Sequence, residues 1–410
     1  MALRTALIVL LLTAVSPIFS DLSRRAILMW QNAPGRLTAI NTFKSHEVKF
    51  ADKTRSCEDG LLVESKGIAI ISCDPGRERW NTVMGLFLPE PIPGGEIYAY
   101  DYKKADAPDS DSFKRFEILG YAPGSNLHTL GMAFHEETST LFVANHRSDG
   151  PTVEMFTLDF VAHTATYFRT IRHPLLRGPN SLTLLNSHEL LVTNDHHFLI
   201  KEQRILSRLE TYLGLPLGTV VHVDISPLIE DPAHPVKAKV LTRVAFANGI
   251  EKLNDTTVAV ASTSRAAVYL FDLASNSNSN SNSNNAFSPP TLTYRSIIKF
   301  PFMVDNLRVT SDGALLAAGH PYAFSLEKYS QTRHLCNDPD ELAAADLAAR
   351  EYCASATAAS WVSKWTEEGG IEDLYVGADF PTSSTAAFDA ERKVGIVTGL
   401  YAKGILVWRE

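Results

Sequence analysis

From about residue 55 onward, apolar and polar positions alternate with the two-residue period of β-strands, and helical periodicity is scarce. The alternation recurs as a unit. In each unit a polar residue precedes an alternating strand, a turn of Gly, Asn, Asp or Glu follows, and a more continuously apolar strand ends in small or polar residues. Six segments fit this unit, and they read CEDGLLVESKGIAIISC, LHTLGMAFHEETSTLFVANH, PNSLTLLNSHELLVTNDHH, ANGIEKLNDTTVAVASTS, DNLRVTSDGALLAAGHP and STAAFDAERKVGIVTGLY.

The spacing of the six copies predicts the fold class. Intervals of about 50 to about 80 residues leave room in each repeat for an outer hairpin, such as PTVEMFTLDF or VYLFDL. Four-stranded repeats of this size are typical of a β-propeller. A β-sandwich needs about half as many strands, and a parallel α/β fold needs helices that are scarce here. We expect an all-β, six-bladed β-propeller in a single domain over residues 21–410, with residues 21–54 forming a helix or closing strand before the first blade.

Two segments interrupt the repeat. The run SNSNSNSNSNN at residues 275–285 is polar and of low complexity, which predicts a disordered connector between outer strands. Residues 331–370 are rich in Ala, and Asp338 followed by Pro339 is typical of a helix start. This second segment predicts a short helical insertion over one face of the propeller.

The first residues, MALRTALIVLLLTAVSPIFSD, indicate the secretory pathway. One positive charge at Arg4 precedes an apolar run that is too short to span a bilayer but suits a signal peptide. Cleavage after Ser20 would remove residues 1–20. Because Ile18 does not suit the −3 position, a retained signal anchor, with membrane association through this segment, is the alternative. We expect a secreted protein, in which the sequon at Asn254 can be glycosylated.

Composition narrows the class of partner. The chain of 410 residues is 45% hydrophobic and 20% charged, which suits a globular protein with a sizeable core. Its formal net charge is −8, and we find no basic patch. A nucleic-acid partner is therefore not expected.

Four cysteines in an oxidising compartment permit two disulfides. Cys57 and Cys73 flank a predicted hairpin that would bring them face to face. Cys336 and Cys353 flank a predicted helix, whose ends would lie roughly 20 Å apart if it were continuous, whereas a disulfide tolerates about 7 Å between Cα atoms. The second pair therefore requires a short helix and a chain that doubles back, and free or otherwise paired thiols are the alternative.

In a propeller the innermost strands of all blades line one channel, so equivalent residues converge there. At the strand entrances the six copies place Glu58, His128, Asn180, Asn248, Asn306 preceded by Asp305, and the group Ser383–Thr385. Carboxylates and amides are the oxygen ligands that Ca²⁺ takes, whereas zinc sites favour Cys and His. The two carboxylates would balance the charge of Ca²⁺. The competing interpretation is that each Asn or Asp merely forms a turn.

Five short stretches carry a resemblance to a known family: CEDG at 57–60, TNDHHF at 193–198, FANGI at 246–250, VDN at 304–306 and GHP at 319–321. Together, and in this order, they resemble the paraoxonase/arylesterase family of six-bladed propellers with two central calcium ions. The resemblance implies hydrolysis of lactones and aryl esters.

The resemblance also implies two sets of metal ligands. The ligands of the catalytic calcium would be Glu58, Asn180, Asn248, Asp305 and Asn306. A second, structural calcium would use Asp59 and the carbonyl of Met132, but the family's further aspartate is Ser181 here. The family's disulfide between first and last strands lacks its cysteines, so closure must rest on strand pairing or on another cysteine pair.

The family's general base is a pair of histidines. His146 matches the second, but Leu130 stands at the first position and His128 lies two residues earlier. His196 and His320 also match family histidines. We expect His146, with His128, to take a proton from the attacking water; Glu58 or Asp305 is the alternative base. The sequence contains no Gly-x-Ser-x-Gly motif, the motif that would indicate a serine hydrolase.

The expected function is calcium-dependent hydrolysis of a small apolar lactone or aryl ester. One alternative is a sugar lactonase of the gluconolactonase type with a single divalent ion. The other is a non-catalytic propeller that binds a partner and keeps calcium for stability.

Overall fold

The computed structural model describes the chain except for residues 1–18, 105–106, 123–125, 232 and 276–286. Most of the expected signal peptide, and nearly all of the low-complexity loop, therefore lie outside the described residues. No described helix has the length and apolar character needed to cross a membrane.

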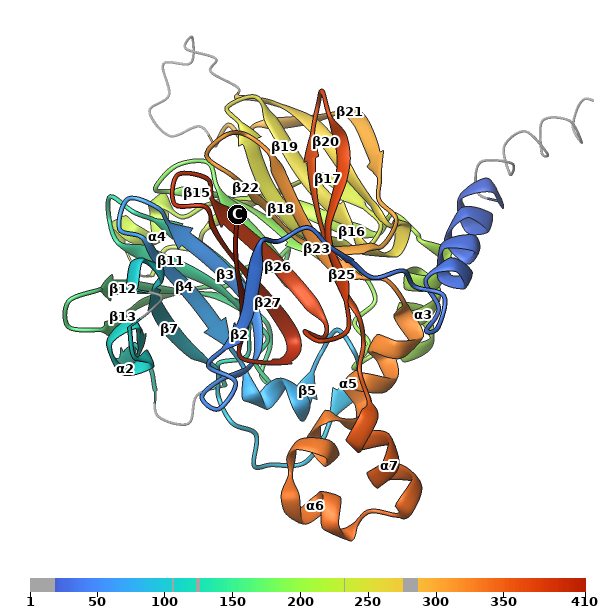
Figure 1. Ribbon diagram of the computed structural model, residues 1–410. Helices are drawn as coiled ribbons and strands as arrows, with labels where there is room; N and C mark the ends of the chain where they lie inside the picture. The colour runs from blue at the N-terminus through green and yellow to red at the C-terminus, as the bar shows by residue number, and fades with distance from the viewer. Residues whose placement is uncertain (1–18, 105–106, 123–125, 232, 276–286) are drawn as a thin grey trace, which may run out of the picture.

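Antiparallel strands dominate the fold (Figure 1). The pairings of the described strands divide them into six groups of four, with three minor pairings in addition. The first three groups are β3 (Arg55–Val63), β4 (Ile68–Cys73), β7 (Glu96–Asp101) and β8 (Phe113–Arg115); β10 (Thr129–His135), β11 (Thr140–Asn145), β12 (Thr152–Asp159) and β13 (Thr164–Ile171); and β14 (Pro179–Leu184), β15 (Glu189–Asn194), β16 (Gly218–Asp224) and β17 (Lys237–Val244). The last three are β18 (Ala247–Asn254), β19 (Thr257–Ser262), β20 (Ala267–Ala274) and β21 (Thr291–Lys299); β22 (Met303–Val309), β23 (Leu315–His320), β24 (Ser360–Thr366) and β25 (Gly370–Gly377); and β26 (Ser383–Asp389), β27 (Val394–Lys403), β28 (Ile405–Arg409) and β2 (Ser45–Lys49). The predicted β class is confirmed.

Three minor pairings extend this arrangement. The short strand β1 (Ile40–Asn41) lies beside β25, β9 (Glu117–Leu119) lies parallel to β13, and β5 (Trp80–Asn81) pairs with β6 (Leu86–Phe87). Each of the six sequence repeats corresponds to the first two strands of one group.

The first strands of the six groups, which we call the central strands, form a closed ring of contacts: β3, β10, β14, β18, β22, β26 and back to β3. They are buried along most of their length, because neighbouring sheets cover them. Apolar clusters fill the space between adjacent groups, such as the one that joins β11 and β15. The ring brings residues from distant parts of the sequence to the centre.

Strand pairing closes the ring. The N-terminal strand β2 pairs with β28, and β27 pairs with β3, so the first and last groups share one sheet. The buried ring of Phe43 stacks on Trp408 of β28 with a centroid distance of 4.8 Å, and on Tyr375 of β25. Residues 19–31, just before this segment, are helical, so the region 21–54 supplies both a helix and a closing strand.

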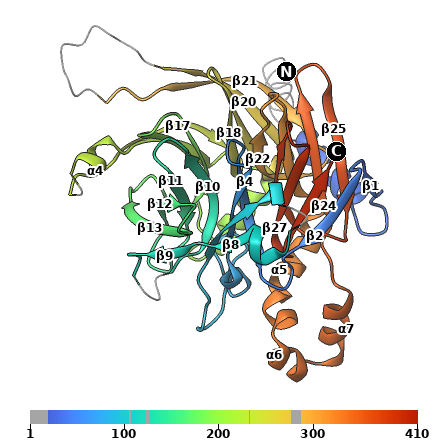
Figure 2. The same cartoon turned by 60° about the vertical axis from the view of Figure 1, so that its left-hand side comes forward.

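Helices lie outside the sheets. The short ones are α2 (Asp109–Ser112), α4 (Ser226–Glu230) and the 3₁₀ turns Pro75–Glu78, Tyr102–Lys104 and Thr263–Arg265. The longer α3 (Arg204–Leu213) follows the TNDHHF segment, and α5 (Ala323–Asn337), α6 (Pro339–Ala344) and α7 (Leu347–Ser355) follow GHP. Figure 2 shows α6 and α7 projecting away from the sheets.

The helical insertion differs in extent from the expected 331–370. It occupies 323–355, and β24 takes up Ser360–Thr366, because SWVSKWT pairs with β23 and β25. The helix breaks at Asp338, which caps α6, and again at Ala345, after which Asp346 caps α7. These two breaks let the chain double back, so Cys336 and Cys353 form a disulfide with their Cα atoms 5.2 Å apart. Cys57 and Cys73 are also bonded, across β3 and β4, as predicted.

Candidate functional site

A β-bulge interrupts every central strand at the equivalent point, near its start. The register with the second strand of the group shifts between Cys57 and Asp59, Thr129 and Met132, Pro179 and Leu182, Ala247 and Ile250, Val304 and Leu307, and Ser383 and Thr385. A bulge sets extra residues opposite one partner and turns a side chain out of the pleat. The six bulges therefore aim side chains from six strands toward one centre.

Four of the bulges carry oxygen donors. Glu58, Asn180 and Asn248 occupy three of them, and Asp305 with Asn306 occupies the fourth. All five side chains are buried. The structure thus brings together every residue predicted to hold the catalytic calcium.

Hydrogen bonds of their amide nitrogens fix the orientation of the three Asn side chains. The amide nitrogen of Asn306 donates to Glu58 Oε1 at 3.1 Å, and that of Asn248 donates to Thr263 Oγ1 at 3.0 Å. The amide nitrogen of Asn180 lies 3.5 Å from Asp195 Oδ2. The amide nitrogens of Asn180 and Asn248 therefore point away from the set, toward Asp195 and Thr263, whereas that of Asn306 points to Glu58 within it.

The remaining oxygens lack partners. Among the described residues nothing donates a hydrogen bond to Glu58 Oε2 or to the Oδ1 atoms of Asn180, Asn248 and Asn306, although all four atoms are buried. A buried acceptor without a donor costs about 1–3 kcal/mol. Four such acceptors form a donor set whose hydrogen-bonding capacity a bound cation would satisfy.

Charge supports the same conclusion. Burial raises the pKa of Glu58 well above its usual range; Arg77 opposes this, whereas the carboxylates of Asp59 and Asp305 add to it. Asp305 is held by His320, whose Nε2 lies 2.9 Å from Asp305 Oδ2. Two neighbouring buried carboxylates oppose each other's ionisation, and a divalent cation between them would relieve that repulsion.

The donor set fits calcium. Two carboxylates and three amide oxygens are hard ligands of the kind that Ca²⁺ takes. Within the described part of the chain, no three His, Cys, Asp or Glu side chains cluster as a metal site, so the set reaches its size only through the amides. Such a set does not suit zinc.

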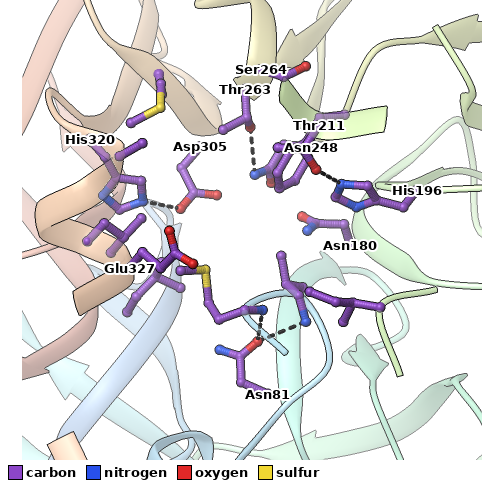
Figure 3. Close-up of a pocket in the computed structure, with 18 of the residues that line it drawn as sticks. Asn81, Asn180, His196, Thr211, Asn248, Thr263, Ser264, Asp305, His320 and Glu327 are labelled. Carbon is purple, nitrogen blue, oxygen red and sulfur yellow. Dashed lines mark hydrogen bonds and ion pairs between the residues drawn. The ribbon is translucent and has the colours of Figure 1, made fainter. Parts of the chain in front are cut away.

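A cavity opens beside these residues, and Asn180, Asn248 and Asp305 are among the side chains that line it (Figure 3). Glu58 lines the same cavity. Its apolar wall consists of Val83, Met84, Leu130, Ile200, Phe246, Met303, Leu326 and Leu400. Helices α3 and α5 border it and are joined by an ion pair of 3.0 Å between Arg208 and Glu327. The site is therefore a polar centre within a mainly apolar chamber.

The two histidines predicted as the base do not line this cavity. His146 is buried; its Nδ1 contacts the hydroxyl of Thr82, and its Nε2 lies 2.9 Å from the carbonyl of Pro179. His128 pairs with Asp74, at 3.2 Å. Burial lowers the pKa of His146, so its ring is neutral at pH 7.

Side chains other than the predicted bases His128 and His146 line the cavity near the central oxygens. In the bulge of β10 the side chain that lines the cavity is Leu130, not His128. His196 and His320 do line it, from the TNDHHF and GHP segments. His196 lies 3.2 Å from Asp195; burial would lower its pKa, but this carboxylate raises it. The resemblance had already set Leu130 at the first histidine position, and in the structure His128 does not take its place in the cavity wall.

The residues predicted for the second calcium lie below the first set and outside the cavity wall. Asp59 is bonded to the guanidinium of Arg308 at 2.6 Å, and Arg308 is also 3.4 Å from the carbonyl of Met132. No pattern in the sequence had singled out Arg308. The sequon residue Asn254 lies elsewhere, exposed in the turn between β18 and β19.

Comparison with known proteins gives a family match. The model of the arylesterase family matches residues 81–336. The chain is 24% identical over 330 residues to serum paraoxonase/lactonase 3 of Oryctolagus cuniculus, covering 78% of this chain and 82% of the rabbit protein. It is 25% identical over 307 residues to serum paraoxonase/arylesterase 1 of Homo sapiens, covering 72% and 76%. A gluconolactonase structure from Xanthomonas campestris matches with a TM-score of 0.48 and 12% identity, covering 89% of both chains.

Proposed function

Because the chain belongs to the arylesterase family, we propose that it is a calcium-dependent hydrolase of lactones and aryl esters built on a six-bladed β-propeller. The observation that carries this proposal is the set of four buried, unpartnered oxygens beside Asp305, at the end of an apolar cavity. The closed ring of central strands supports the propeller, with each four-stranded group as one blade.

In this proposal Glu58, Asn180, Asn248, Asp305 and Asn306 hold one calcium ion. When bound, the ion supplies a Lewis acid that polarises a substrate carbonyl and stabilises the oxyanion formed there. The chain itself supplies the ligand oxygens and holds them in position. Its bulges fix the oxygens before substrate arrives, so little reorganisation is needed during the reaction.

We assign proton transfer to Asp305. Its carboxylate lines the cavity, and His320 fixes one of its oxygens. Water adds through its oxygen to the carbonyl carbon, and its proton passes to Asp305. The carbon–oxygen bond to the leaving group then breaks, and the proton returns to the departing alkoxide or phenoxide. A histidine base at His146 is the alternative, but both of its ring nitrogens already have partners in the protein.

The cavity wall favours apolar substrates. Leu130, Phe246 and Met303 give the cavity an apolar surface against which an alkyl chain or an aryl ring can pack, although polar side chains such as Asn81 and Arg208 line it as well. We therefore propose lactones with alkyl chains, or aryl esters, in preference to sugar lactones.

The two disulfides support synthesis in the secretory pathway, since such bonds persist in oxidising compartments. The serum origin named for the relatives is consistent with this. The exposure of Asn254 in the sequon supports a glycan at this residue.

The test is a panel of alkyl lactones and aryl acetates assayed with calcium and with excess chelator. Asp305→Asn and Glu58→Gln each remove a carboxylate from the centre. We expect each variant, like chelation, to lower kcat/KM by about a hundredfold or more. Asp312→Asn, in the exposed turn of the same hairpin, is the matched control and should retain full activity.

Two outcomes would contradict parts of this proposal. Full activity in either central variant would exclude the calcium mechanism. If His146→Gln lost as much activity as Asp305→Asn and flattened the acid limb of the pH–rate profile, the base would be the histidine. Calcium binding without turnover of any substrate in the panel would favour a non-catalytic propeller.

A further inference from the structure

A buried guanidinium occupies the place expected for the second, structural ion. Arg308, on the central strand β22, is 8% exposed at its side chain, and Asp59 on β3 is fully buried. One terminal nitrogen of Arg308 donates to both oxygens of Asp59, at 2.7 and 2.6 Å. It also lies 3.4 Å from the carbonyl of Met132, the other ligand expected for that ion.

Both carboxylate oxygens of Asp59 already accept hydrogen bonds from the protein. Besides Arg308, its Oδ1 accepts from the amide of Gly60 at 2.8 Å and from the hydroxyl of Thr385 at 2.9 Å. Its Oδ2 accepts from the amide of Met132 at 2.7 Å. An ionised carboxylate offers about four lone-pair directions, and here they are taken. This is the reverse of the catalytic centre, where four buried oxygens have no donor.

The guanidinium of Arg308 supplies the positive charge that the buried carboxylate of Asp59 needs. A second carboxylate, Glu251 on β18, lies 3.2 Å from the other terminal nitrogen of Arg308. An arginine guanidinium is protonated throughout the physiological pH range, so it brings a permanent positive charge to Asp59 and Glu251. At the position where the family resemblance implies a further aspartate, the chain has the neutral Ser181. One carboxylate is absent, and a monovalent cation stands where a divalent one was expected.

The network around Arg308 reaches all six central strands. Arg308 itself joins β22 to Asp59 of β3, to the Met132 carbonyl of β10 and to Glu251 of β18. Thr183 of β14 donates to Glu251 at 3.0 Å, and Thr385 of β26 donates to Asp59. The side chain thus links the strands around the axis, as a central ion would.

We propose that Arg308 replaces the structural calcium, so that this chain has one cation site in its channel and a covalently attached cation in place of the second. The residues Asp59, Met132 and Ser181 do not fit a metal ion while Arg308 is present. Removing the guanidinium and restoring an acid at position 181 should recreate a metal site there.

The test counts bound calcium per folded chain by equilibrium dialysis with radioactive Ca²⁺. The double variant Arg308→Ser/Ser181→Asp should bind one ion more than the wild-type chain. Its melting temperature should rise on addition of calcium by more than that of the wild type. Adding Asp59→Asn to the double variant is the matched control, and it should remove the extra ion.

Equal ion counts in the wild type and in a double variant shown to be folded by circular dichroism would overturn the proposal. A wild-type chain that carries two calcium ions, counted by native mass spectrometry, would also overturn it, and this measurement needs no variant to fold. The extra ion is a difference between two chains, so the result does not depend on whether the catalytic centre binds calcium or hydrolyses a substrate.

Discussion

At the scale of single residues, the central oxygens owe their direction to the partners of the amide nitrogens. Thr263 accepts from Asn248 and itself donates to the carbonyl of Val304 at 2.7 Å, so its hydroxyl is fixed on both sides. Glu58 plays the same part for Asn306. An amide held in this way presents its oxygen without a choice of rotamer, which lowers the entropy cost of binding a cation.

His146 gives a prediction on stability at low pH. Burial lowers the pKa of His146 below its ordinary value of about 6.5. Between the two pKa values the unfolded chain binds a proton that the folded chain does not, so the free energy of unfolding falls as the pH drops below about 6.5. In urea titrations between pH 7 and 5, we expect His146→Gln to lose less stability on acidification than the wild type does. His188→Gln, at an exposed turn, should follow the wild-type slope; equal slopes in all three chains would contradict the assignment.

The same residues show what a sequence reveals about a site. Glu58, Asn180, Asn248 and the Asp305–Asn306 pair could be predicted, because polar residues at strand entrances stand out against an apolar pattern. Arg308 could not, because a charged residue within LRV has the alternation of a strand with one face in solvent. A central strand is covered on both faces, and this coverage exists only once the ring has formed.

At the scale of elements, the sequence patterns did not predict the bulges, and they predicted the helical insertion with different bounds. Asp338 caps α6 by accepting from the amides of Asp340 and Glu341, as its sequence context indicated. The predicted range 331–370 of the insertion was wrong because an Ala-rich sequence does not show where a helix stops. The position of the helix end is marked instead by Asp346, which caps the next helix.

The disulfide of this insertion carries a second prediction. Helices α6 and α7 bury no side chain, so Cys336–Cys353 is their principal tie to α5. A disulfide that closes a loop of about 15 residues stabilises by about 3 kcal/mol in the chain-entropy model. We expect Cys336→Ala/Cys353→Ala to speed amide hydrogen exchange across 339–355, while the central strands keep their protection.

The other disulfide is the comparison for that experiment. Cys57 and Cys73 lie in paired strands whose backbone hydrogen bonds remain when the sulfur bridge is lost. Their replacement by Ala should therefore raise exchange in β3 and β4 much less. Unchanged protection of α6 and α7 in the first variant would mean that contacts with α5 are sufficient to hold them.

At the scale of the whole molecule, stability depends on joining the two ends of the chain. Without a disulfide between first and last strands, closure rests on β2 against β28 and on β27 against β3. Phe43 is the apolar anchor of this closure, since it stacks on rings from two different groups, Tyr375 of β25 and Trp408 of β28. Loss of the anchor would free β2 and expose β28 as an unpaired edge.

Phe43→Ala should therefore lower the free energy of unfolding by about 3 kcal/mol, the lower end of the range for a buried Phe, and increase aggregation on heating. Val48→Ala is the matched control, because Val48 belongs to the same closing segment but is 42% exposed, and it should change stability little. Chemical denaturation and light scattering measure the two effects. Equal stability of the Phe43 and Val48 variants would show that backbone pairing alone closes the ring, and that the aromatic stack contributes no more than its surface.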